Sequence, residues 1–129
     1  MVKEVLLNLK NLIIDKQLFK SVKIGLEDGI SAKDTPFCRL LIEEETVNQE
    51  NGDLEVNLII LIGTLRLKSI EETYLKHLDI KDNLISTLDL YAKNNYEVSY
   101  QGSLTDQDDV ENFKITALHF KITIKAVLW

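Results

Sequence analysis

The chain has few of the residues from which reactive or metal-binding sites are usually built. Its 129 residues include one cysteine, two histidines and five glycines. A lone Cys38 cannot form an intrachain disulfide, and His77 and His119 stand too far apart in sequence to suggest a zinc site. The glycines never take the spacing of a phosphate-binding loop. These absences argue against a disulfide scaffold, a zinc site and a nucleotide-binding loop, and they favour a reducing compartment.

Positive charge and long apolar runs are also scarce. Fifteen Lys and Arg stand against 21 Asp and Glu, a formal charge of −6. Nucleic-acid affinity comes largely from cations that neutralise phosphates, so no sequence-specific nucleic acid is expected. No apolar segment approaches the roughly 20 residues that span a bilayer. The opening MVKEVLLNLKNLIIDK mixes acid and base and has no small-residue cleavage site. We therefore expect no membrane partner and a cytoplasmic location.

What is present is the composition of an ordered protein. Apolar residues make up 45% of the chain, and there is a single proline. A chain of this length buries a sizeable core, and we find no linker, repeat or low-complexity tract. We predict one α+β domain over residues 1–129.

Hydrophobic periodicity predicts the elements of the first half. Residues 2–15 carry apolar side chains at helical spacing, and residues 19–26 alternate as a half-buried strand does. A strand should begin at Phe37, just after Pro36, and run to Val47. Asn51-Gly52 favours a tight turn with positive φ at both central residues, which would join that strand to residues 54–67 as a long hairpin.

The second half reads as a helix followed by two strands. Ser69 with Glu71 and Glu72 resembles a helix start, and the apolar stripe predicts a helix as far as Lys93. Strands are expected at residues 96–101 and 113–128. The apolar positions of the last strand change phase, which predicts a bulge near Ala117-Leu118.

Together these elements predict a fold class. The order is α-β-β-β-α-β-β, and the class is α+β. We expect one mixed, mainly antiparallel sheet with both helices packed on one face, and a long β-hairpin around Asn51-Gly52.

Two acidic clusters are candidate sites. Glu43-Glu44-Glu45 alternates faces on a strand, so only Glu43 and Glu45 could cooperate in acid-base catalysis, and a solvated or interface rim is favoured. The stretch from Asp106 to Glu111 holds acids but lacks the spacing of a calcium loop. It is interpreted as an acidic loop, and whether it binds a cation is left open.

The remaining candidates are interpreted as structural. Cys38 lies on an apolar strand beside Arg39 with no nearby histidine, so a buried structural thiol is favoured over a nucleophile. His77 and His119 lack triad partners. Tyr96 and Tyr100 share a strand face but have no basic groove beside them. No catalytic, cofactor-binding or metal residue is predicted, no cofactor is expected, and we expect the chain not to be an enzyme.

The segment LEVNLIILIGTLRL at residues 54–67 is apolar on both faces of its pleat. Helices usually cover one face of such a sheet, so the second face needs another cover, and further copies of the chain would supply it. The sequence leaves open which face is the interface. We assign to it Leu58, Ile60, Ile62, Tyr96 and Tyr100, and expect Ile60→Asp to disrupt assembly more than folding.

The layout of the chain resembles that of a known family. LFKSVKIGLEDGI leads through a polar segment to PFCRLLIEEE, followed by a long hairpin ending in ILIGTL, a helix and a closing strand pair. This order resembles the tail terminator, or tail-completion, proteins of long-tailed bacteriophages and prophages. The resemblance covers nearly the whole chain, and it rests on layout and size.

The resemblance implies a structural, non-enzymatic tail assembly protein. It would form a homo-oligomer, a hexameric ring that caps the tail tube and joins it to the head. Its partners would be itself, the tail tube protein and head-tail connector proteins. It would lie in the host cytoplasm during assembly and then in the virion tail. The alternative from the sequence is a small bacterial oligomeric domain that binds a ligand or regulates.

Overall fold

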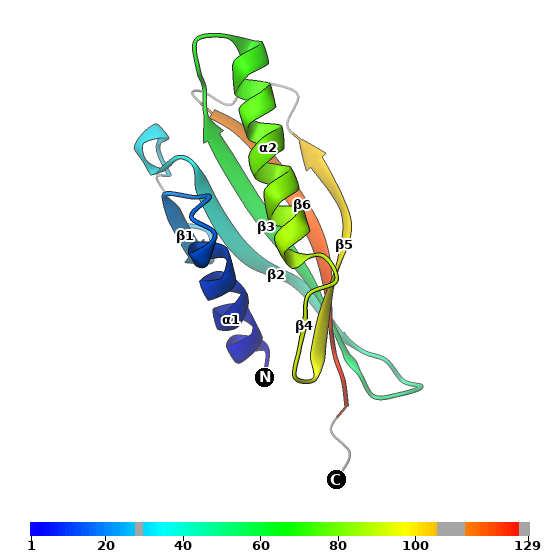
Figure 1. Cartoon of the computed structure of the whole chain (residues 1–129). Coiled ribbons are helices and arrows are strands. Elements are labelled where there is room, and N and C mark those ends of the chain that lie inside the picture. The colour runs from blue at the N-terminus through cyan, green and yellow to red at the C-terminus, as the bar shows by residue number, and fades with distance from the viewer. Residues whose placement is uncertain (28–29, 106–112, 127–129) are drawn as a thin grey trace.

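The fold of this computed structural model is a mixed six-stranded sheet with two helices on one face (Figure 1). The structure describes residues 1–27, 30–105 and 113–126. In chain order the elements are α1 (Val2–Asp15), β1 (Ser21–Ile24), the 3-10 turn η1 (Ala32–Asp34), β2 (Phe37–Val47), β3 (Leu54–Leu65), α2 (Ile70–Leu88), β4 (Ala92–Lys93), β5 (Tyr96–Thr105) and β6 (Phe113–Ile124). The predicted α+β class, order and helix placement are confirmed.

The sheet has the order β1-β2-β3-β6-β5-β4. β1 runs parallel to β2, and the other neighbours are antiparallel. β1 ends opposite Leu40, so the second half of β2 continues without a strand on that side. β4 pairs with the first two residues of β5. Two bulges interrupt the ladders, between Ile42 and Glu44 in β2 and between Tyr100 and Gly102 in β5.

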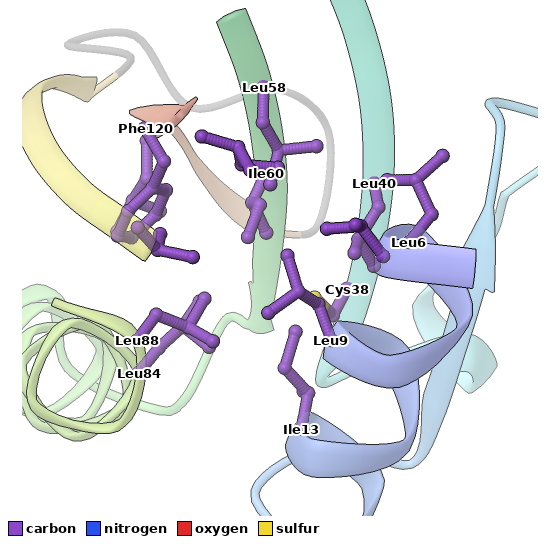
Figure 2. Close-up of a cluster of buried hydrophobic side chains, with 14 of the residues drawn as sticks. Leu6, Leu9, Ile13, Cys38, Leu40, Leu58, Ile60, Leu84, Leu88 and Phe120 are labelled. Atoms are coloured by element: carbon purple, nitrogen blue, oxygen red, sulfur yellow. The ribbon is translucent and has the colours of Figure 1, made fainter. Parts of the chain in front are cut away.

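The core lies between the sheet and the two helices. α1 presents one apolar stripe to it, because Val5, Leu6, Leu9 and Ile13 recur at helical spacing. Figure 2 shows Leu6, Leu9 and Ile13 of this stripe meeting side chains of β2, β3, β6 and α2. The largest fully buried apolar side chains there are Leu9, Ile13, Leu40, Leu58, Ile60, Ile62, Leu84, Leu88, Leu118, Phe120 and Ile122.

Three predicted details are wrong. α2 ends at Leu88 and not at Lys93, because Asp89 is extended and Leu90 has φ +63°. The hairpin turn is longer than a two-residue turn: the Asn48 amide bonds to the Asp53 carbonyl, and Gly52 but not Asn51 has positive φ. β6 pairs with β3 in unbroken register, so no bulge lies at Ala117-Leu118. None of the helices in the described ranges is long and apolar enough to cross a membrane.

Candidate assembly surface

The sheet face opposite the helices, here called the outer face, is divided into an apolar and a polar half. Because successive strand residues alternate faces, the register lists the side chains that share this face. One row is Leu41, Ile59 and His119, and the next is Arg39, Leu61, Ala117 and Leu104. Towards the hairpin the rows turn polar, with Glu44, Asn57, Lys121 and Ser99, then Thr46, Glu55, Thr123 and Glu97.

The apolar half forms a continuous group without a helix over it. We define the outer apolar patch as Leu41, Ile59, Leu61, Leu104, Ile115 and Ala117. Five of its members are half-buried, and Leu104 is 74% exposed. None of the six belongs to the core cluster or packs against it. A contiguous apolar patch on a protein surface more often marks a site of interaction than a surface that stays exposed to solvent.

One corner of the outer face is closed by the chain itself. Arg39 is fully buried there, and its guanidinium donates to the carbonyls of Ser21 and Cys38 at 3.1 and 3.0 Å. It also donates to Glu27 at 2.7 Å and lies 5.4 Å from the Phe37 ring centroid. Hydrogen bonds from Lys23 and then Arg39 lower the pKa of Glu27. The ion pair with Arg39 thereby holds Glu27, just after β1, against the outer face.

The five residues predicted as the subunit interface lie elsewhere. Leu58, Ile60 and Ile62 are 0% exposed under the helices, and Tyr96 is 6% exposed. The Tyr100 ring packs against Phe120 with centroids 5.4 Å apart, and Tyr100 borders the core. The prediction that both faces of β3 need cover is consistent with this structure, but the residues named for the interface lie on the face that the helices cover. Side chains with no exposed area in one chain cannot contact another.

The surface residues that sequence reasoning missed are Ile59, Leu61, Ile115 and Ala117. A signal for them existed in the last strand, where Ile115 and Ala117 precede the change of phase. That change was interpreted as a bulge. In the regular strand it means that the apolar residues pass from the outer face to the core face at Leu118.

Glu43, Glu44 and Glu45 are all exposed on the part of β2 that β1 leaves unpaired. The bulge between Ile42 and Glu44 lies within this run. Charges and a bulge are common devices that prevent an exposed strand edge from pairing indiscriminately. The geometry fits the predicted solvated or interface rim.

The other candidate groups are built into the fold. Cys38 is buried, and burial raises the pKa of its thiol, which disfavours the reactive thiolate. His77 is buried between Thr64 and Thr116, at 2.7 Å from Nδ1 and 2.5 Å from Nε2 to the hydroxyls. His119 is half-buried in the outer face. Within the part of the chain that the structure describes, no group of three or more His, Cys, Asp or Glu could hold a metal ion. Residues 106–112 lie outside the described residues.

A groove of about 490 Å³ opens between the start of α1 and the turn into β5. Met1, Glu4, Val5, Asn8, Lys93, Asn94, Asn95, Tyr96 and Ile124 line it. Asn8 joins the two sides: its amide donates to the hydroxyls of Tyr91 and Tyr96, and its carbonyl accepts from Lys93 at 3.1 Å. Burial raises the pKa of Tyr96. The groove offers polar contacts but no reactive pair of groups.

No protein-family model and no curated protein matches this sequence. Among solved structures, the chain is similar to one from a structure described as "Virion of native gene transfer agent (GTA) particle". The TM-score is 0.47 and the identity 10%, with 92% of this chain and 84% of that chain covered.

Proposed function

We propose that this protein is a structural assembly protein of a phage or prophage tail, a tail terminator whose copies form a ring through the outer face of the sheet. The observation that carries the proposal is the outer apolar patch, which lies opposite both helices. Covering the patch with another copy would remove its apolar surface from water. This burial stabilises the assembly by about 25 cal/mol for each Å² of apolar surface buried. The layout resemblance indicates which assembly protein this is.

A ring requires two different surfaces that meet head to tail. The outer face supplies one of them, with its polar half as a rim around the apolar patch. The projecting end of the β2–β3 hairpin, seen at the lower right of Figure 1, supplies a second surface at a different place on the chain. In this role the protein is not an enzyme and needs no cofactor. Its partners are its own copies, the tail tube protein and the head-tail connector proteins.

Two neighbouring residues on opposite faces test the proposal. Leu61 belongs to the outer apolar patch, and Ile60 lies in the core. Leu61→Asp should leave the circular dichroism spectrum intact and abolish oligomers in analytical ultracentrifugation. Because Ile60 is 0% exposed, the expectation from the sequence is reversed: Ile60→Asp should unfold the chain, since an unpaired buried carboxylate costs several kcal/mol, on the order of 5. Oligomers that persist in folded Leu61→Asp would refute the outer face as the interface.

The terminator role needs a separate experiment. Negative-stain electron microscopy of the assembled wild-type protein should show closed rings. The wild-type protein is then added to assembling tail tube protein from the same phage or prophage. It should limit the length of the tubes and should be seen at one end of each tube. Open filaments, or tubes of unchanged length, would contradict the terminator role. The broader proposal of a structural assembly protein would then stand without it.

A second candidate is a small oligomeric domain that binds a ligand, and the groove beside Asn8 favours it. Its volume falls within the range of small-molecule sites, roughly 300–1,000 Å³. A thermal-shift screen of small polar metabolites would support this candidate if a compound stabilised the wild type but not Asn8→Leu. A screen without such a compound would count against it.

A further inference from the structure

A small cleft at the start of α2 contains Lys114, which has no anionic partner among the described residues. Arg66, Ile70, Thr73, Tyr74 and Lys114 line it. Lys114 is 8% exposed, and its ammonium lies 5.3 Å from the centroid of the Tyr74 ring. In the described ranges, no hydrogen bond or ion pair engages this ammonium. Burying a charge is costly unless it is paired, so the cleft is suited to receive a carboxylate.

The helix adds to this preference. Ile70, Thr73 and Tyr74 lie on one stripe of α2 and face the cleft, whereas the acidic Glu71 and Glu72 do not line it. The positive end of the helix dipole therefore acts on the same space as Lys114. Ile70, which is 68% exposed, adds an apolar side chain at the edge of the cleft.

The opposite charge lies on the edge of β2. Glu43, Glu44 and Glu45 are exposed and take part in none of the ion pairs between described residues. By contrast, Glu27 pairs with Lys23 and Arg39, and Glu55 pairs with Lys121. Val47, two residues further along β2, is 52% exposed.

We propose that the Glu43–Glu45 run of one copy binds the Lys114 cleft of the next copy. The two surfaces of a single chain cannot meet: Glu44 lies opposite Asn57, eight residues from Leu65 along β3, about 26 Å at roughly 3.3 Å per residue. A carboxylate of the run pairs with the Lys114 ammonium, and Val47 packs against Ile70. This contact rests on the proposed assembly function: it belongs to the same head-to-tail interface, in which the hairpin arm of one copy lies on the next copy, and it adds the Lys114 cleft to the surface that receives the arm.

Two charge reversals test this contact. The arm variant carries Glu43→Lys and Glu45→Lys, and the cleft variant carries Lys114→Glu. Each alone brings like charges together and should remain monomeric where the wild type is oligomeric. Mixed one to one, the Lys arm meets the Glu cleft and the Glu arm meets the Lys cleft, so assembly should return. The readout is the sedimentation coefficient.

Matched controls separate charge from folding. Asp79→Lys with Asp82→Lys makes the same change in net charge as the arm variant, at exposed positions of α2 that do not line the cleft, and should assemble as the wild type does. Because Lys114 is buried, each variant is first shown to be folded by circular dichroism. If Lys114→Glu unfolds the chain, Lys114→Gln replaces it and should weaken assembly at least about tenfold.

The outcomes distinguish this contact from the function on which it rests. A wild type that stays monomeric at high concentration would overturn the assembly function. A wild type that assembles, together with reversed variants that assemble equally well, would overturn only the arm-to-cleft contact. Reversed variants that stay monomeric after mixing would overturn it too, because complementary charge would then not be what joins the copies.

Discussion

At the scale of single residues, His77 is a buried base held neutral by its surroundings. Burial first, and then the charges of Lys114 and Lys81, lowers the pKa of His77 from 6.5 to about 4. Between pH 4 and pH 6.5, His77 is therefore mostly protonated in the unfolded chain and mostly neutral in the folded chain. Stability should be full above pH 6.5 and fall as the pH drops towards 4, by about 3 kcal/mol at about 1.4 kcal/mol per pKa unit. Urea unfolding at a series of pH values measures this loss.

The control for this pH dependence is His77→Gln. Glutamine has no titrating group, and its amide still offers hydrogen bonds to Thr64 or Thr116. The variant should be less stable than the wild type at pH 7, with the difference narrowing towards pH 4. Parallel stability curves for the two proteins would show that His77 is not the group responsible.

The Phe37 ring leaves no room for a side chain at Gly63. A Cβ at this position would lie 2.2 Å from Cε2 of the Phe37 ring, which occupies the outer face above Gly63. Gly63→Ala should therefore destabilise the chain by about 1–3 kcal/mol through overpacking. Guanidinium unfolding of the single and double variants tests the cause. Gly63→Ala should cost less in a Phe37→Leu background than in the wild type, and an equal cost in both would exclude the ring.

At the scale of elements, the start of α2 depends on one cap. The Ser69 hydroxyl accepts the Glu72 amide at 2.9 Å. Ser69→Ala removes that acceptor and should lower stability by about 1 kcal/mol. Ser86→Ala, at an exposed position inside the same helix, should be neutral or stabilising by a few tenths of a kcal/mol. Thermal unfolding compares the two, and equal melting temperatures would mean that the cap is not needed.

Local chemistry predicted where most elements begin, because it involves only neighbouring residues. Ser69 caps α2 as expected, and β2 begins at Phe37 after Pro36. The end of α2 was missed because Leu90 takes positive φ without being glycine or asparagine. Its amide bonds to the Val98 carbonyl and the Tyr91 carbonyl accepts the Val98 amide, so contacts across the β4–β5 turn determine this end.

The candidate surface was predicted in kind but not in position. Ile59 and Ile60 are identical side chains on adjacent residues, so periodicity shows that both faces of β3 are apolar and cannot show which one the helices take. The choice depends on the partners of β3. Phe120 and Leu118 of β6 share the face of Leu58 and Ile60, and the helices cover these larger side chains. Ala117 and Ile115 remain on the other face.

At the scale of the whole molecule, a two-layer fold has one sheet face more than its helices cover. Both helices lie on the core face (Figure 1), and on the outer face Glu27, just after β1, bonds to the buried Arg39 at one corner. The long β3 and β6 strands, paired over 12 residues, extend the uncovered face along the molecule. The outer apolar patch is therefore a consequence of topology, and the polar half beside it limits where a second copy can bind.

If copies assemble through this patch, stability must depend on protein concentration. Association removes folded monomer and so raises the melting temperature by mass action. A hundredfold rise in concentration should add about 2–3 kcal/mol once assembly is tight, or several degrees for a domain of this size. Differential scanning calorimetry at two concentrations measures the shift. In Leu61→Asp the melting temperature should not change with concentration, and a concentration-independent wild type would contradict assembly.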